Sequence, residues 1–119
     1  MVRSTWAALV DGLSPSDVSL LTAYRDLVSS LDGVEERIHS AEIDFAVKRV
    51  FTSAYVKSHW LEVGIDLTRQ LSSYKHLRTS FASTKTVFTH RFTLSSASHL
   101  SALKPLLVEA RDTVGPGFR

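Results

Sequence analysis

The sequence predicts an α+β domain in which an N-terminal and a C-terminal helix pack on one face of a small antiparallel sheet. Three observations support this prediction. A capped amphipathic segment lies near the N-terminus, hydrophobic residues alternate at period two through the middle of the chain, and an apolar stripe at helical spacing follows. This order favours helices that cover one side of a sheet of about four strands, a meander plus one late strand.

The bulk composition indicates a single globular domain spanning residues 1–119. The hydrophobic fraction of 44% and the charged fraction of 22% are ordinary values for such a domain. The absence of cysteine excludes disulfides and thiolate chemistry and fits a reducing compartment. The sequence has neither a signal-like N-terminus nor an apolar run long enough to span a membrane. We therefore expect a soluble, cytoplasmic protein.

The first long helix is predicted by its caps. A segment at 5–10 precedes it and is too short to form a stable helix on its own. Ser14 can cap the helix, Pro15 suits the first helical position, and Asp17 supplies the acid of a capping box. Gly33 lies where a helix usually ends. The apolar stripe between these signals consists of Leu20, Leu21, Tyr24, Leu27, Val28 and Leu31.

The central part of the chain predicts short strands. Hydrophobic residues alternate over 43–48 and 61–67, with a further strand at 51–56 and a turn at 57–59. Residues 34–39 alternate only loosely and add at most a short leading strand. Strands in such close succession favour an antiparallel meander with one face on the core.

The segment 68–85 is rich in Ser, Thr, Lys and Arg, and we expect a long loop with at most one helical turn. The strand at 87–94 follows. Its alternation is strict, so that one face carries Phe88, His90, Phe92 and Leu94.

The last helix is predicted by a second apolar stripe that ends before Gly115. Ser95–Ser98 supply possible caps for this helix. Pro105 either kinks the helix or marks its true first turn. The stripe consists of Leu100, Leu103, Leu107 and Ala110.

Several short signatures, taken in order, resemble a known family. They are Arg3–Trp6, Ser14-Pro15, Ile43-x-Phe45, Phe51, Leu61–Leu67, His90-x-Phe92-x-Leu94, Glu109-Ala110 and Val114-Gly115. The pattern resembles the bacterial family catalogued as domain of unknown function 5655, especially its small stand-alone actinobacterial members, and the resemblance covers nearly the whole chain. It implies a compact α+β fold for which no activity is established.

The chain departs from that family pattern at two places. The family has a Lys-Thr pair before the Ile-x-Phe strand, where this chain has Ser40-Ala41. The family also has an acidic residue early in the last helix, where this chain has His99. If either feature served a shared site, this chain lacks it.

His90 is the strongest single candidate for a functional residue. It could line a pocket with Phe45 and Phe88 and bind an anionic or hydrogen-bonding ligand, or move a proton as an acid/base. The alternative is a neutral core histidine that is hydrogen-bonded within the fold. We favour this structural alternative, because no acidic partner can be named from the sequence.

Four acidic residues occupy positions of neighbouring strands that are expected to point away from the core. They are Glu42, Asp44, Glu62 and Asp66. Paired carboxylates serve glycoside hydrolysis, but cross-strand ion pairs are the simpler expectation. The expected basic partners are Lys48, Lys57 and Arg91.

We expect aromatic and basic residues to share that outward face: Trp60 and Tyr55 with Lys48, Arg49 and Arg91. Such a mixture is typical of single-stranded nucleic-acid binding, and residues 42–92 hold eight basic and four acidic side chains. The acids on the same face would repel phosphate. An apolar face would instead favour a protein partner or a homodimer.

We therefore predict a binding domain that takes a small ligand near His90, or a protein partner, including a second copy of itself, through the sheet. The candidate ligand-binding residues are His90, Phe45, Phe88, Arg91, Lys48 and Trp60. The alternatives are a weak nucleic-acid-binding accessory protein that uses the basic 48–91 region, and an enzyme with His90 as acid/base. We predict no cofactor and no metal, because the five histidines show no ligand spacing.

Overall fold

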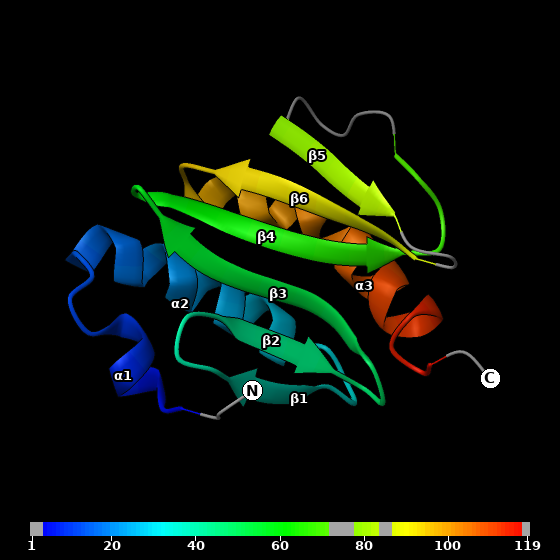
Figure 1. The fold of residues 1–119 in the computed structure, drawn as a ribbon, viewed down its shortest axis with the longest axis horizontal. Coiled ribbons are helices and arrows are strands. Elements are labelled where there is room, and N and C mark those ends of the chain that lie inside the picture. Colours follow the sequence, from blue (N-terminus) through cyan, green and yellow to red (C-terminus); the bar gives the residue numbers. More distant parts are fainter. Residues whose placement is uncertain (1–3, 72–77, 84–86, 118–119) are drawn as a thin grey trace.

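Six antiparallel strands form one sheet in the order β1-β2-β3-β4-β6-β5, and the long N-terminal helix and the C-terminal helices pack on one of its faces (Figure 1). This computed structural model describes residues 4–71, 78–83 and 87–117, with the backbone alone for 78–83. The predicted α+β class is confirmed, although the sheet has more strands than the four expected. The strands are β1 Glu35–Ile38, β2 Ile43–Ala46, β3 Val50–Lys57, β4 Trp60–Leu67, β5 Arg78–Ser83 and β6 Phe88–Leu94. The helices are α1 Trp6–Val10, α2 Pro15–Ser29, the 3₁₀ helix η1 Ala97–Leu103 and α3 Lys104–Thr113.

Helix α2 begins as its caps predict. The Ser14 hydroxyl accepts the backbone N–H of Asp17 at 3.2 Å, and Pro15 occupies the first turn, where a missing N–H costs nothing. Beyond its last residue the chain turns at Gly33, whose φ of +79° favours glycine. The helix buries Leu21, Tyr24 and Val28 against the sheet.

A buried chain of hydrogen bonds ties α2 to the sheet. The Thr52 hydroxyl donates to the Gly64 carbonyl at 2.7 Å, so its oxygen accepts the Tyr24 hydroxyl proton at 3.1 Å. Burial raises the pKa of Tyr24 far above its ordinary value, which keeps the phenol neutral as a donor. One helix and two strands are thereby held in register.

The segment 68–85 does not form the predicted loop throughout, because it contains β5. This strand pairs with β6 from Arg78↔Thr93 to Ser83↔Phe88, so β6 lies between β4 and β5 and does not close the sheet. β5 is an edge strand with one pairing neighbour, and its short polar sequence carries little of the apolar alternation that identifies inner strands. Residues 72–77 and 84–86 of this segment fall outside the described residues, so the expected helical turn stays a prediction.

The C-terminal helical region is divided at Pro105. The 3₁₀ helix η1 ends at Leu103, and Pro105 occupies the first turn of α3. Of the two alternatives for this proline, the structure confirms that it marks the true start of the α-helix.

Candidate functional site

His90 is a fully buried core residue of β6. Its Nε2 accepts the backbone N–H of Leu71 at 2.9 Å, so the ring proton lies on Nδ1, which donates to the Phe88 carbonyl at 3.1 Å. Burial lowers the pKa of His90, because an imidazolium would lose its hydration, and the hydrogen bonds to backbone carbonyls only partly offset this. Both ring nitrogens are thus used in holding the strand, as the structural alternative requires.

The pH dependence of folding should report the neutral state of His90. The unfolded residue binds a proton below its ordinary pKa of 6.5, whereas the folded residue resists protonation until lower pH. We therefore expect the contribution of His90 to the free energy of unfolding to be complete above pH 6.5 and to fall as the pH drops below it. Urea denaturation of the wild type and His90→Gln between pH 5 and 8 measures this. The difference in free energy of unfolding between wild type and variant should be constant at the alkaline end. It should shift in favour of the variant as the pH falls, and a constant difference throughout would contradict a lowered pKa of His90.

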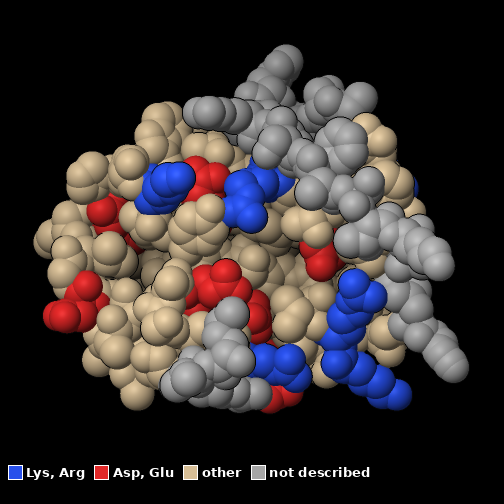
Figure 2. All heavy atoms as spheres, viewed as in Figure 1, with Lys and Arg blue, Asp and Glu red and all other residues tan. Residues whose placement is uncertain are grey.

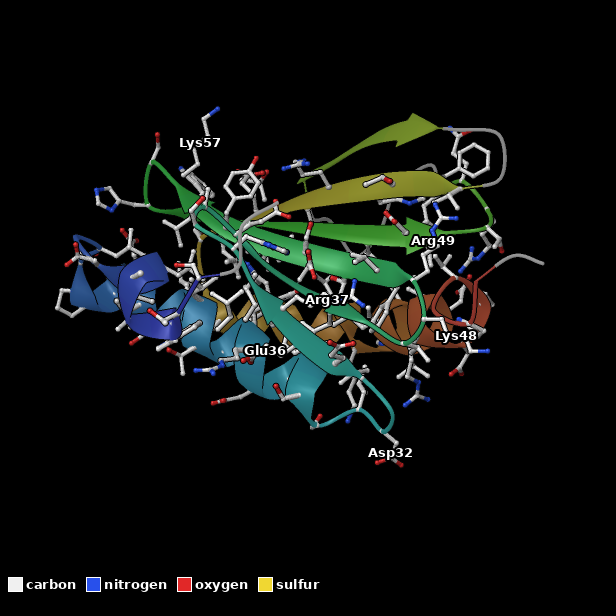
Figure 3. All side chains as sticks on the ribbon, turned by 60° about the horizontal axis from the view of Figure 1, so that its bottom comes forward. Asp32, Glu36, Arg37, Lys48, Arg49 and Lys57 are labelled. Carbon is white, nitrogen blue, oxygen red and sulfur yellow. The ribbon has the colours of Figure 1, made fainter. Side chains whose placement is uncertain are left out.

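The six residues predicted to bind a ligand do not gather in one place. Phe45 and His90 are buried on the helix-covered face of the sheet, and half-buried Phe88 shares their parity. Arg91 and Trp60 lie on the opposite, open face, and Lys48 is exposed in the turn between β2 and β3 (Figure 3). The sheet separates the set, so it cannot act as one site.

The open face of the sheet is charged, and Figure 2 shows acidic and basic side chains interspersed on it. Among the described residues, Glu62 and Asp66 form hydrogen bonds with threonines of β6. Glu62 accepts from Thr93 at 2.9 Å and Asp66 from Thr89 at 2.7 Å, because β6 lies beside β4 and places each threonine directly opposite an acid. Arg91 instead lies over the ring of Tyr55 and donates to its hydroxyl.

The charge on this face weakens both the homodimer and the nucleic-acid hypotheses. An apolar homodimer interface would require an uncharged face, which the described residues do not provide. Burial raises the pKa of Asp66, and the hydroxyl of Thr89 opposes that shift. The acids next to Arg91 also weaken the case for phosphate binding. Both the partner and the nucleic-acid hypotheses stay predictions.

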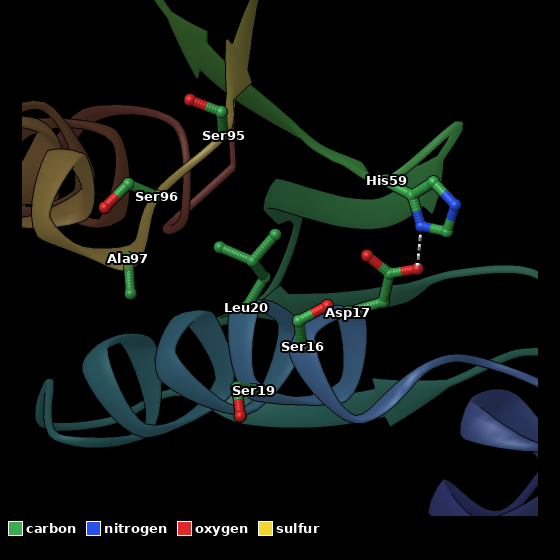
Figure 4. A pocket seen from close by; sticks show the side chains of 8 residues that line it. All are labelled: Ser16, Asp17, Ser19, Leu20, His59, Ser95, Ser96 and Ala97. Carbon is green, nitrogen blue, oxygen red and sulfur yellow. Dashed lines mark hydrogen bonds and ion pairs between the residues drawn. The ribbon is translucent and has the colours of Figure 1, made fainter.

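A pocket of about 370 Å³ opens elsewhere, where three distant segments meet (Figure 4). The first turns of α2 form one side, the β3–β4 turn forms a second, and the connection from β6 to η1 forms a third. It is lined by Ser16, Asp17, Ser19, Leu20, His59, Ser95, Ser96 and Ala97. Sequence reasoning assigned Asp17 only to a helix cap and His59 only to a surface turn, because neither pattern shows that the two meet.

Asp17 and His59 form one wall of this pocket. The Asp17 carboxylate lies 2.7 Å from His59 Nδ1, and the side chains are 5% and 80% exposed, respectively. The turn that carries His59 is strained, since Ser58 and His59 have φ of 52° and 66°, values that glycine or asparagine adopt more readily. The bond to Asp17 helps hold that turn against the helix, which gives the pocket a preformed wall.

Serine, histidine and aspartate together suggest nucleophilic catalysis, but their arrangement does not support it. Such a relay needs the second imidazole nitrogen to reach a serine hydroxyl. In Figure 4 this nitrogen of His59 points away from Ser95 and Ser96. The Ser96 hydroxyl already caps η1 by accepting the Ser98 N–H at 3.2 Å.

Comparisons of the chain with models of protein families, with curated proteins and with solved structures found no match. The family resemblance drawn from the sequence signatures therefore stays a prediction. Within the part of the chain that the structure describes, no helix is both long and apolar enough to cross a membrane.

Proposed function

We propose that this protein is a binding domain whose pocket at the N-terminus of α2 takes a small polar ligand. The observation that carries the proposal is the buried Asp17 carboxyl group in a pocket of about 370 Å³ that four serines also line. Ligand sites are typically concave and partly preformed, with a few convergent polar groups, and this volume falls at the small end of their range.

The lining favours a ligand with hydroxyl or ammonium groups. A carboxylate only accepts hydrogen bonds, whereas serine hydroxyls both donate and accept them, so together they suit a molecule rich in donors. Asp17 disfavours a phosphate or a carboxylate at the same place through charge repulsion. Leu20 and Ala97 add an apolar wall for the carbon skeleton of a small polyol, sugar or amine.

Filling the pocket, or removing the charge of Asp17, should weaken ligand binding without unfolding the protein. Ala97→Phe places a ring in the opening from an exposed position, and Asp17→Asn removes the charge but keeps the shape. We expect each to weaken binding at least tenfold, about 1.4 kcal/mol. Saturation-transfer NMR with a panel of monosaccharides and small primary amines measures this. The matched controls are Ala8→Phe, exposed on α1, and Asp26→Asn, exposed on α2 but outside the pocket.

Two results would overturn the proposal. One is the absence of binding by the wild type to every member of the panel. The other is equal binding by Ala97→Phe and Ala8→Phe, which would place the ligand elsewhere. Native mass spectrometry of wild-type protein from cell extract adds an independent readout, because a retained small molecule would appear as added mass that Ala97→Phe lacks.

A second candidate function is docking of a protein partner on the open face of the sheet. Trp60 favours it, because its side chain is 42% exposed and tryptophan is enriched at protein interfaces. The residues around Trp60 are polar, and they do not indicate what kind of protein would bind there. We therefore rank this candidate below the pocket. The same native mass spectra would reveal a bound protein.

A further inference from the structure

Three buried side-chain atoms of the described residues lack a hydrogen-bond partner, and all three belong to one hairpin. They are Nε of Arg37, Nδ1 of His39 and Oδ1 of Asp44. An unsatisfied buried polar atom costs about 1–3 kcal/mol, and native folds contain few of them. Their concentration at one place indicates a group that the described residues do not supply.

The β1–β2 hairpin brings these atoms together on the open face of the sheet. The backbone N–H of His39 donates to the Glu42 carbonyl at 2.8 Å across the turn, and Arg37 lies directly opposite Asp44. Because side chains alternate along a strand, Arg37, His39, Glu42 and Asp44 project to the same side. Figure 3 shows Arg37 over the sheet, in contrast to Glu36, which faces α2.

His39, Glu42 and Asp44 form a cluster with the donor set of a transition-metal site. Each offers one ligand atom, and these atoms all lie within 4.8 Å of one another. His39 and Asp44 are only 8% and 6% exposed, and His39 Nε2 lies 2.8 Å from Asp44 Oδ2. One imidazole nitrogen with two carboxylate oxygens suits Zn²⁺ better than Ca²⁺ or Mg²⁺, which prefer more oxygen ligands or water.

We propose that His39, Glu42 and Asp44 bind a divalent transition metal of the Zn²⁺ class. Oδ1 of Asp44, one of the unsatisfied atoms, belongs to a residue of this donor set, so a bound cation gives that oxygen a partner. Arg37 fits the same account, because three protein ligands leave a coordination position for a water or an oxyanion. That exogenous ligand is the acceptor that the buried Nε of Arg37 lacks.

The sequence did not predict this site. Its ligands follow a His-x-x-Glu-x-Asp spacing that matches no helical metal motif. The two-residue turn at Ser40-Ala41 brings these three residues together. It places His39 opposite Glu42 and diagonally across the hairpin from Asp44. The site lies on the sheet and shares no residue with the pocket of Asp17 and His59, so each proposal can fail alone.

Metal titration of the full chain tests the proposal. After treatment with a chelator, calorimetry with ZnCl₂ should show one bound ion per chain, and CoCl₂ should produce visible absorption bands. His39→Gln and Glu42→Gln should weaken both at least about tenfold. His59→Gln and Asp66→Asn are the matched controls, because they alter another histidine and another sheet acid outside the cluster, and they should bind as the wild type does.

Circular dichroism without metal shows whether each variant is folded. Glu42 is chosen because it is half-buried, so its replacement carries less risk to the fold than that of Asp44. The role of Arg37 has its own readout: acetate should change the Co²⁺ spectrum of the wild type and have a smaller effect on Arg37→Gln. No stoichiometric binding by the wild type, or equal affinity in folded His39→Gln and Glu42→Gln, would overturn the metal site. An unchanged acetate response in Arg37→Gln would overturn the role of Arg37.

Discussion

Replacing Phe45 with alanine is expected to lower the free energy of unfolding by about 3–5 kcal/mol. Phe45 is fully buried in β2, and its ring meets the edge of Tyr24 in α2 with centroids 5.8 Å apart and planes at 62°. Alanine would remove this contact between helix and sheet and leave a cavity. Since small domains have a total stability of about 5–15 kcal/mol, the variant should be close to unfolding.

Urea denaturation followed by circular dichroism measures this loss. Trp60→Ala is the matched control, because it truncates an exposed aromatic of the same sheet and should change stability by only about 0.5 kcal/mol. Phe45→Leu should fall between the two. A loss below about 1 kcal/mol in Phe45→Ala would show that the residue is not a core residue, and would restore Phe45 as a candidate for ligand contact.

Gly115→Ala is expected to cost about 3 kcal/mol, a large effect for one added methyl group. A Cβ at Gly115 would overlap the Arg111 carbonyl oxygen and lie 2.9 Å from a methyl carbon of Val47. The Gly115 carbonyl also accepts the backbone N–H groups of Lys48 and Arg49 at 2.8 and 2.9 Å. The backbone shift that relieves the clash would therefore weaken the attachment of the β2–β3 turn to the end of α3.

Gly64→Ala is the matched control for this prediction. The nearest atom to a Cβ there is the Ser53 hydroxyl oxygen at 3.2 Å, the end of a side chain that can rotate, so we expect a change below about 1 kcal/mol. Thermal unfolding of both variants gives the comparison. Similar melting temperatures for the two would contradict the argument that backbone crowding makes Gly115 indispensable.

Much of the fold could be predicted from local patterns. Ser14 and Pro15 identified the start of α2, and alternation identified β2, β3, β4 and β6, because both signals arise within one element. β5 escaped, since an edge strand is paired on one side only and its sequence needs little apolar alternation. Local patterns also do not reveal the order of strands in the sheet. The sequence therefore did not show that β6 places threonines opposite Glu62 and Asp66, and basic partners were expected instead.

The pocket could not be predicted because it is a tertiary feature. Asp17, His59 and Ser95 lie in segments about 40 residues apart, and only the packing of the β3–β4 turn on α2 brings them together. The cluster in the β1–β2 hairpin was within reach, however. Histidine and glutamate flanking a two-residue turn must face each other if the turn forms a hairpin, and that signal was available at 39–42.

We propose that the ligand site lies where α2, the β3–β4 turn and the β6–η1 connection meet. Amide NMR shifts of ¹⁵N-labelled protein, titrated with the monosaccharide and amine panel, test it most directly. We predict that the perturbed amides cluster at residues 16–20, 59 and 95–97, and that Ala97→Phe abolishes the shifts. Perturbations centred instead on Leu71, Phe88 and His90, or on Tyr55 and Arg91 across the open face, would contradict the claim.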